Sequence, residues 1–260
     1  MDLTNASVLV TGGAGGFGSA TVRRLAARGA KVVIADVADE RGQTLAREVG
    51  AGAVYVRTDI LDEDSIARAV EAATALGPLR AAVVVHGGPP APGSKGPVRV
   101  IDREGKRLPL SVFAHSVNVY LISAFSVTSQ AAEAMARNAP LKDGQRGVVI
   151  NTASIAGYEG QPGQSAYSAA KGGIIGMTLT LARDLAPLGI RAMAIAPGTF
   201  LTFAYASRMT DEQAQAHWGP MVPNPKRMGD PDEYALLAQQ IVENDFLNGT
   251  TIRLDGAQRF

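Results

Sequence analysis

Two residues four positions apart, Tyr167 and Lys171, have the types and spacing that proton transfer needs. On a helix, residues at this spacing share one face, so the ammonium would lie beside the phenol. A neighbouring positive charge favours the phenolate and lowers the tyrosine pKa from its reference of about 10, so Tyr167 could exchange a proton with an alcohol near neutral pH. Ser154, on the loop after an apolar run, could hydrogen-bond the same substrate oxygen. A Tyr-x-x-x-Lys match by itself is a weak signal, because it arises by chance in many helices.

A glycine-rich segment near the start of the chain has the pattern of a phosphate-binding loop. Residues 6–10 are apolar and partly β-branched, as in a buried strand, and a helical pattern begins at Ser19. Between them, Gly12, Gly16 and Gly18 follow a Gly-x-x-x-Gly-x-Gly spacing. Glycines let the backbone turn tightly and approach a pyrophosphate, whose charge suits a helix N-terminus. A glycine loop alone is often only a turn, but strand, loop and helix together predict a dinucleotide site.

The end of the second predicted strand carries a residue that would select the dinucleotide. Residues 31–35 are followed by Asp36, which lies 18 positions after Gly18, near the separation of about 20 expected in such sites. A carboxylate there accepts hydrogen bonds from the ribose hydroxyls and repels a 2′-phosphate, so NAD is favoured over NADP. Two alternatives remain: Asp36 could be only a turn residue or a helix cap, and Arg41 could moderate the repulsion.

These residues together resemble the short-chain dehydrogenase/reductase family, of the single-domain type, over nearly the whole chain. Residues 11–18 are similar to the glycine loop of that family. The resemblance implies an oxidoreductase that uses NAD, and it implies further cofactor contacts. They comprise one more residue of the glycine loop, an adenine-binding pair, a glycine near the ribose and a segment that orients the nicotinamide carboxamide: Phe17, Asp59, Ile60, Gly88, Pro197, Gly198 and Thr202.

The resemblance also implies a catalytic tetrad. Asn118 would hold a proton-relay water near Lys171, and Ser154 would hold the substrate oxygen. Tyr167 would act as general base in oxidation and as general acid in reduction. Lys171 would lower the pKa of Tyr167 and bind the nicotinamide ribose. The spacing from Tyr to Lys fits the alcohol dehydrogenase and ketoreductase branch of the family, in which no metal is required.

Three segments narrow the resemblance within the family. Residues 147–164, 182–191 and 244–257 are similar to 3-hydroxyacyl-CoA dehydrogenases of type 2, also called 17β-hydroxysteroid dehydrogenases of type 10. A long connection at about 87–109 resembles the insertion of that group. We therefore expect an NAD-dependent 3-hydroxyacyl-CoA dehydrogenase. Two alternatives remain open: a dehydrogenase of a hydroxysteroid or other hydrophobic secondary alcohol, and a catalytically idle NAD-binding scaffold.

The substrate side is less clear from the sequence. The resemblance places Gln164 there, beside Ser154 and Tyr167, together with a substrate loop at about 200–225. Apolar walls suit an acyl chain or a flat ring system, although aromatic and Met residues at such spacing are also typical of simple packing. The apolar residues of this loop are Phe200, which we expect at the substrate, and Phe203, Tyr205, Met209, Trp218 and Met221. Basic residues in the connection could attract a CoA phosphate or form a solvated surface: Lys95, Arg99, Arg103, Lys106 and Arg107.

One segment departs from the pattern of the family. After its fourth strand the family has Asn-x-Ala-Gly, whereas this chain has Val85, His86, Gly87 and Gly88. The missing Asn normally helps to tie the central strands together, so its loss puts the local hydrogen bonding in question. His86 could contact cofactor or substrate, or it could only fill a small gap.

The predicted elements alternate between strands and helices, which implies parallel strands joined by crossover helices. The fold class is therefore an α/β single-domain Rossmann fold over residues 1–260, a doubly wound parallel sheet flanked by helices. Ligands of such a sheet bind at the carboxyl ends of its strands. Strands are predicted at 6–10, 31–35, 53–56, 81–85, 148–151, 191–194 and 251–254, and helices at 19–28, 64–76, 110–136, 164–185 and 231–242.

Composition limits the function further. The net charge of +1 offers no attraction to nucleic acid or membrane, and the absence of cysteine excludes disulfides and thiolate chemistry. Residues 1–5 lead directly into the first strand, so we expect no signal peptide, no transmembrane run and a cytoplasmic location. The family resemblance implies a homotetramer, although the apolar faces of residues 110–136 and 172–185 would fit the sheet equally well.

Overall fold

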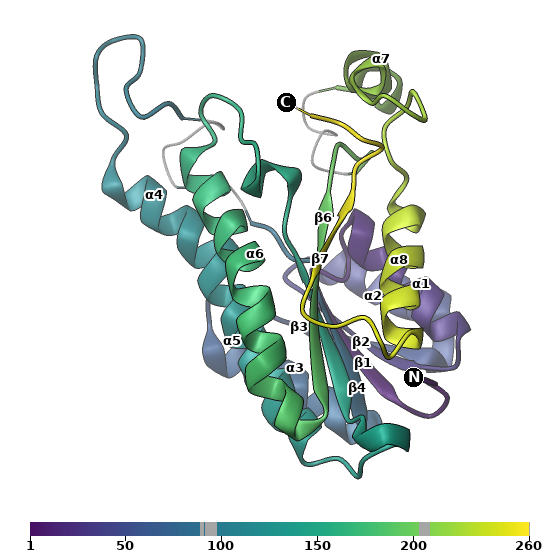
Figure 1. The fold of residues 1–260 in the computed structure, drawn as a ribbon. Helices are drawn as coiled ribbons and strands as arrows, with labels where there is room; N and C mark the ends of the chain where they lie inside the picture. The colour runs from purple at the N-terminus through teal and green to yellow at the C-terminus, as the bar shows by residue number, and fades with distance from the viewer. Residues whose placement is uncertain (89–90, 92–97, 203–208, 260) are drawn as a thin grey trace.

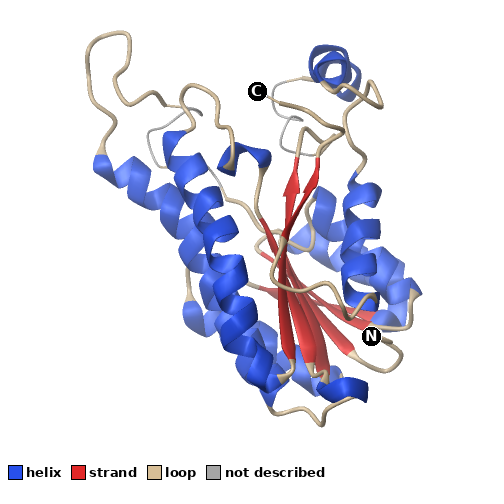
Figure 2. Cartoon of the chain, in the orientation of Figure 1, coloured by secondary structure: helices blue, strands red, loops and turns tan. Residues whose placement is uncertain are grey.

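Figure 1 shows the chain in a computed structural model, which describes residues 1–88, 91, 98–202 and 209–259. In this part of the chain, seven parallel strands form one sheet in the order β3-β2-β1-β4-β5-β6-β7 (Figure 2). The α/β doubly wound fold predicted from the sequence is confirmed. The strands are β1 (Ser7–Thr11), β2 (Lys31–Asp36), β3 (Ala53–Arg57), β4 (Leu79–Val84), β5 (Gly147–Thr152), β6 (Ile190–Pro197) and β7 (Thr251–Leu254).

The central strands are covered on both faces, so they are continuous apolar runs rather than alternating ones. In β1, Val8 and Val10 belong to the core on one face of the sheet, while Leu9 belongs to the core on the other. Helices α1, α2 and α8 cover the first face, and α3, α5 and α6 cover the second (Figure 1). Their bounds are α1 (Gly16–Ala27), α2 (Asp39–Val49), α3 (Glu63–Leu76), α5 (Ser123–Ala136), α6 (Ser165–Leu185) and α8 (Pro231–Glu243).

Two helices were not predicted from the sequence. Helix α2 buries only Gly42 and Leu45, so its apolar stripe is narrow and its helical period is hard to recognise. Helix α7 (Asp211–Trp218) lies inside the predicted substrate loop. It begins with a capping box in which Thr210 and Gln213 exchange side-chain and backbone hydrogen bonds. That Thr-x-x-Gln spacing was the signal that would have revealed it.

The predicted helix at 110–136 is helical throughout but not uniform. Helix α4 (Leu110–Val117) and helix α5 are joined by a π-helical turn over Asn118–Ile122. Such a turn inserts one extra residue and redirects the side chains around it, and it is frequent at functional sites. The turn begins at Asn118, one of the residues predicted to be catalytic.

The stretch Leu110–Ala136 is long and apolar enough, by length and composition alone, to cross a membrane. The sequence predicts no transmembrane run, whereas by length and composition this stretch is a candidate for one. A core helix of a globular protein passes the same test, and α5 packs Val127, Ala131 and Met135 into the core on one face of the sheet. Its opposite side leaves Phe125 exposed. The outer side of α5 is mixed, because Ser129 and Glu133 are exposed there beside Phe125.

The connection between β4 and α4 contains a small hairpin. Ile101 and Arg107 form an antiparallel bridge, and the Asp102 N–H donates to the Lys106 carbonyl at 2.9 Å. Three residues that the sequence analysis singled out lie outside the described residues: Lys95, Phe203 and Tyr205.

The topology of the sheet places its ligand-binding crevice. Strand β1 lies between β2 and β4, so the chain winds outward in opposite directions from this point. The loops that follow β1 and β4 diverge there and leave a crevice at the carboxyl ends of the strands. The glycine loop follows β1, and His86 to Gly88 follow β4. The segments predicted to bind a dinucleotide therefore meet at one edge of the sheet.

Candidate active site

Helix α6 carries Tyr167 and Lys171 on one face. The Lys171 side chain is almost fully buried, and its Nζ lies 5.8 Å from the centre of the Tyr167 ring. Nζ donates a hydrogen bond of 2.6 Å to the carbonyl of Thr152, the last residue of β5. Burial lowers the pKa of Lys171 to about 7, because the charged form loses its hydration. The predicted pairing of amine and phenol is thus present, with the amine anchored to the sheet.

Ser154 reaches the same site through the turn after β5. It caps a short 3₁₀ turn, Ile155–Gly157, and its Oγ accepts from the Ala156 N–H at 3.1 Å. The turn lies directly against α6: a Cβ on Gly157 would stand 2.9 Å from the carbonyl carbon of Lys171. Only glycine allows that approach, so the turn that carries Ser154 is held beside Lys171. The Ser154 hydroxyl keeps its own hydrogen for another partner.

Asn118 lies on another element that packs against α6. It is exposed, and it stands where α4 changes to the π-turn. Helix α6 packs against both α4 and this turn, so Asn118 lies on an element that contacts the helix of Tyr167 and Lys171. The four residues predicted to form the tetrad therefore come from three elements that pack together.

The glycine loop is shaped by close approaches that no side chain would allow. A Cβ on Gly18 would stand 2.1 Å from the Gly12 carbonyl oxygen, and a Cβ on Gly12 would stand 2.7 Å from the His86 Cα. Gly12 also has a φ of +66°, which favours glycine. A Cβ on Gly16 would meet Thr202 at 3.2 Å, which brings together the predicted pyrophosphate and nicotinamide segments. This cradle at the start of α1 fits a dinucleotide.

Asp36, at the end of β2, supports the glycine loop directly. Its Oδ2 accepts from the Ala14 N–H at 3.0 Å, and its Oδ1 accepts from the Ala38 N–H at 3.0 Å. The turn role that the sequence analysis kept as an alternative is therefore present. Each carboxylate oxygen has a further lone pair, so these contacts leave room for ribose hydroxyls. Asp36 joins the loop after β1 to the loop after β2.

The predicted adenine pair lies at the next strand end. Asp59 is exposed, its Oδ1 accepts from the Leu61 N–H at 2.9 Å, and its own N–H donates to Ser65 Oγ at 3.0 Å. Ile60 beside it is partly exposed. These contacts fix the turn before α3 at the carboxyl end of β3, in line with Asp36 on β2.

Three predicted residues have other roles in this structure. Phe17 stacks on Tyr234 with ring centres 4.5 Å apart, and Phe200 is buried edge-on against Phe17 at 5.0 Å. Phe200 thus fits the packing alternative rather than a substrate contact. Gln164 turns its side-chain oxygen to the Gln161 N–H at 2.9 Å, which shapes the loop before α6.

In the segment after β4 that departs from the family pattern, His86 is buried and neutral. His86 Nε2 lies 2.7 Å from Ser123 Oγ, and Nδ1 lies 2.8 Å from Thr11 Oγ1. The Ser123 hydroxyl donates to the Val119 carbonyl at 2.7 Å, so it accepts from His86 Nε2–H. Nδ1 then accepts from the hydroxyl of Thr11. Burial, and secondarily Lys171, lowers the pKa of His86 to about 3. His86 therefore connects β1 to the start of α5, rather than only filling a gap.

The central strands are tied by a second residue. Thr152 Oγ1 donates to the Val84 carbonyl of β4 at 2.7 Å. The same oxygen lies 2.7 Å from the hydroxyl of the buried Tyr234 of α8, which donates to it. Thr152 and His86 together make the connections that the missing Asn put in question.

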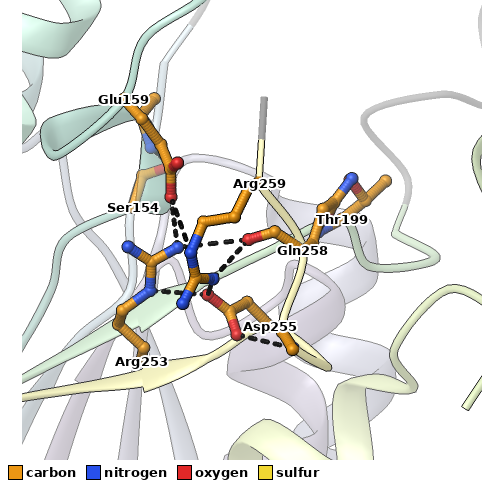
Figure 3. Close-up of polar contacts among 9 residues, drawn as sticks. Ser154, Glu159, Thr199, Arg253, Asp255, Gln258 and Arg259 are labelled. Atoms are coloured by element: carbon orange, nitrogen blue, oxygen red, sulfur yellow. Dashed lines mark hydrogen bonds and ion pairs between the residues drawn. The ribbon is translucent and has the colours of Figure 1, made fainter. Parts of the chain in front are cut away.

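The C-terminal segment braces both loops that flank the site (Figure 3). Arg253 of β7 pairs with Glu159, five residues after Ser154, and its Nε donates to Asp255 at 2.7 Å. Gln258 Oε1 accepts from the N–H and the hydroxyl of Thr199 at 3.0 and 2.9 Å. The segment after Ser154 and the segment after Pro197 are thus fastened to one tail. Sequence reasoning missed this brace because its members are far apart along the chain.

Comparison with known proteins identifies the class. The model of the short chain dehydrogenase family matches residues 6–213, so the chain belongs to that family, the short-chain dehydrogenases/reductases. It is an oxidoreductase that acts on CH–OH groups with a nicotinamide cofactor.

The similarity to particular members extends over almost the full length. The chain is 45% identical to 3-hydroxyacyl-CoA dehydrogenase type-2 of Homo sapiens, over 96% of this chain and 94% of the relative. It is 41% identical to the protein of that name from Drosophila melanogaster, over 99% and 98% of the two chains. The crystal structure of 3-hydroxyacyl-CoA dehydrogenase type-2 from Mycobacterium avium superposes with a TM-score of 0.92 at 47% identity, covering 98% of this chain and 96% of that one.

The histidine predicts an acid sensitivity of the fold. An exposed histidine titrates near 6.5, whereas burial holds the pKa of His86 at about 3, so between these values the unfolded chain binds one more proton. Stability is therefore lost as the pH falls through this window, by about 1.4 kcal/mol per pH unit. We expect His86→Asn to reduce that slope in urea unfolding at pH 6.5 and 5.5. His217→Asn, which changes an exposed ring, is the control. Equal slopes in wild type and His86→Asn would contradict the assignment.

Proposed function

We propose that the enzyme is an NAD-dependent dehydrogenase that interconverts a 3-hydroxyacyl-CoA and the corresponding 3-ketoacyl-CoA. The observation that carries this proposal is the 41–45% identity, over nearly the full length, to enzymes named 3-hydroxyacyl-CoA dehydrogenase type-2. The buried pairing of Lys171 with Tyr167 supports it, because proton exchange with an alcohol requires such a phenol.

The proposed proton chemistry follows from the arrangement around α6. In oxidation, the Tyr167 phenolate takes the proton of the substrate hydroxyl, and in reduction the phenol returns it. The Lys171 ammonium, unscreened because it is buried, favours the phenolate. Ser154 donates its free hydrogen to the substrate oxygen, and Asn118 holds a water that relays protons toward Lys171. The bound nicotinamide supplies the hydride acceptor in oxidation and the donor in reduction.

The proposed cofactor residues lie at the carboxyl ends of the strands and near the start of α6. The N–H groups at the start of α1 would face the pyrophosphate, and the close packing at Gly12, Gly16 and Gly18 shapes the loop that would hold it. Asp36 accepts from the adenosine ribose, which favours NAD over NADP. The remaining proposed contacts are Phe17, through its backbone in the loop, with Asp59, Ile60, Gly88, Tyr167, Lys171, Pro197, Gly198 and Thr202.

A hollow next to the start of α6 supports a large substrate. A cavity of about 590 Å³ opens between Arg99 to Ile101 of the connection and Gly160 to Gly163 of the loop before α6. It continues to Ser165 and Ser168 on the helix that carries Tyr167. A guanidinium at its rim suits a CoA phosphate. The described part of the chain thus contains a cavity and a positive charge that would suit an acyl-CoA.

Assembly and location stay predictions. A homotetramer is supported by apolar side chains that the described part of one chain leaves exposed, at Ile122, Phe125 and Leu179 on neighbouring helices. Pairing of these helices between subunits would cover them. A cytoplasmic location is likewise proposed.

Removing the Tyr167 hydroxyl should stop the chemistry and spare the cofactor site. We expect Tyr167→Phe to lower kcat by at least about 10²-fold, because general acid–base catalysis is lost. NADH binding, followed by its fluorescence, should stay within about twofold of wild type, since the ring remains. Tyr158→Phe, which changes an exposed phenol two residues after Ala156, is the matched control. Unchanged turnover in Tyr167→Phe would refute the proposed role.

The charge at Asp36 should set the preference for NAD over NADP. Asp36→Asn removes the repulsion of a 2′-phosphate but keeps one oxygen for the backbone N–H groups. We expect the ratio of kcat/KM for NAD over NADP to fall by about tenfold or more, which corresponds to roughly 1.4 kcal/mol. Asp143→Asn makes the same charge change in the turn before β5, at the opposite end of the sheet, and should leave the ratio unchanged. A ratio unaffected by Asp36→Asn would show that another group selects the cofactor.

A panel of alcohols tests the substrate. NADH formation is measured with 3-hydroxyacyl-CoA thioesters of several chain lengths, a hydroxysteroid and a simple hydrophobic secondary alcohol. The proposal expects kcat/KM at least about tenfold higher for a thioester than for the other alcohols, because only a thioester fills the hollow beside Arg99. Turnover of the other alcohols alone would indicate a broader dehydrogenase, and no turnover at all would indicate an NAD-binding scaffold.

A further inference from the structure

An aromatic side chain outside the predicted site lies against both members of the proton-transfer pair. Tyr120 belongs to the π-turn and follows Asn118 by two residues. Its ring meets that of Tyr167 edge to face, with centres 5.0 Å apart and planes at 87°. The Nζ of Lys171 lies 5.1 Å from the centre of the Tyr120 ring, nearer than to the Tyr167 ring at 5.8 Å. Tyr120 thus touches the acid–base residue and the residue that activates it.

An aromatic ring face would stabilise the Lys171 ammonium in its buried surroundings. Lys171 is buried, and burial alone lowers its pKa to about 7. Among the described residues, the titratable groups that face it are Tyr167 of α6, Tyr120 of the π-turn and His86 after β4. Burial raises the pKa of Tyr120 and lowers that of His86, so both are neutral at pH 7. The attraction that keeps Lys171 charged therefore comes from the Thr152 carbonyl and the ring faces.

The same ring also contacts the loop after β4. A Cβ on Gly87 would stand 3.4 Å from the Tyr120 ring, and the Tyr120 hydroxyl donates a long hydrogen bond of 3.5 Å to the Gly88 carbonyl. The neighbouring Val119 closes on Gly88, where a Cβ would stand 2.7 Å away. The π-turn therefore clamps the glycine segment that stands in place of the family's Ala-Gly. These contacts fix the orientation of Tyr120 toward α6.

We propose that Tyr120 is a positioning residue for proton transfer: its ring holds the Tyr167 ring edge-on and offers its face to the Lys171 ammonium. This inference rests on the proposed role of Tyr167 and deepens it. The extra residue of the π-turn is what directs a side chain two positions after Asn118 toward α6. Hydroxyl and ring have separable tasks. The hydroxyl contacts the loop beside the cofactor, and the ring acts on the catalytic pair.

The test compares Tyr120→Phe with Tyr120→Leu. Both variants lose the contact with Gly88, and only Leu loses the ring, so their difference isolates the ring. We expect Tyr120→Phe to keep kcat within about twofold, and Tyr120→Leu to lower it on the order of tenfold. The alkaline limb of the pH profile of kcat should move to lower pH in Tyr120→Leu, because without the ring face the ammonium loses its proton at lower pH. Phe246→Leu removes an exposed ring outside the site and serves as control.

A second readout does not depend on turnover. The ionisation of Tyr167 is taken as the difference between the spectrophotometric tyrosine titrations of the chain and of the same chain carrying Tyr167→Phe. We expect the Tyr167 phenolate to form at higher pH in Tyr120→Leu than in wild type or Tyr120→Phe, because less ammonium is present to stabilise it. If the wild type oxidises none of the alcohols, the proposed function fails, and this titration still decides the role of Tyr120.

Two outcomes overturn the inference. The first is a Tyr120→Leu enzyme with the kcat, the alkaline limb and the Tyr167 titration of wild type. The second is an equal loss in Tyr120→Phe and Tyr120→Leu, which would assign the effect to the hydroxyl and Gly88. Should Tyr120→Leu fail to fold by thermal melting, Tyr120→Met replaces it, since an unbranched apolar chain fills the space without an aromatic face.

Discussion

The buried ammonium of Lys171 is the interaction on which the rest of the site depends. Removed from water, the amine would lose its proton easily, yet a charge in such a place acts strongly on a neighbouring phenol because no solvent screens it. The Thr152 carbonyl at the end of β5 and the ring of Tyr120 hold that charge beside Tyr167. Strand β5, helix α6 and the π-turn must therefore keep their relative positions for the phenol to work.

Those positions are kept by polar contacts that add no free charge near the ammonium. His86 is neutral and connects Thr11 of β1 to Ser123 of α5 through both ring nitrogens. The C-terminal brace is charged, but Arg253 is paired with Glu159 and Asp255 (Figure 3). Both sets of contacts lie at the carboxyl ends of the strands. The end of the sheet that gathers the ligand-binding loops is thus held by its own polar contacts.

Most elements could be predicted because their local patterns agree with their environment. Buried parallel strands such as β5 are continuous apolar runs, and α6 has the length and composition of a helix that packs on a sheet. The exceptions have physical reasons. Helix α2 buries too little for its period to be recognised, and α7 depends on a capping box and on packing of the segment around it. The π-turn inside 110–136 has no local signature, because it is stabilised by contacts with Gly88 and α6.

The sequence by itself determined the chemistry. The spacing of Tyr167 and Lys171, the glycine pattern of residues 12–18 and Asp36 after a strand are local relations, and secondary structure converts each directly into a shared face or a shared loop. Only the tertiary structure decided which other side chains complete the site. His86 and Thr11, which contact each other, are 75 residues apart in the sequence. The Tyr120 ring, on the π-turn, contacts the Tyr167 ring, on α6. Such contacts depend on strand order and helix packing, which no short stretch of sequence encodes. For the same reason the contact of Phe200 with Phe17 could not be predicted from the sequence.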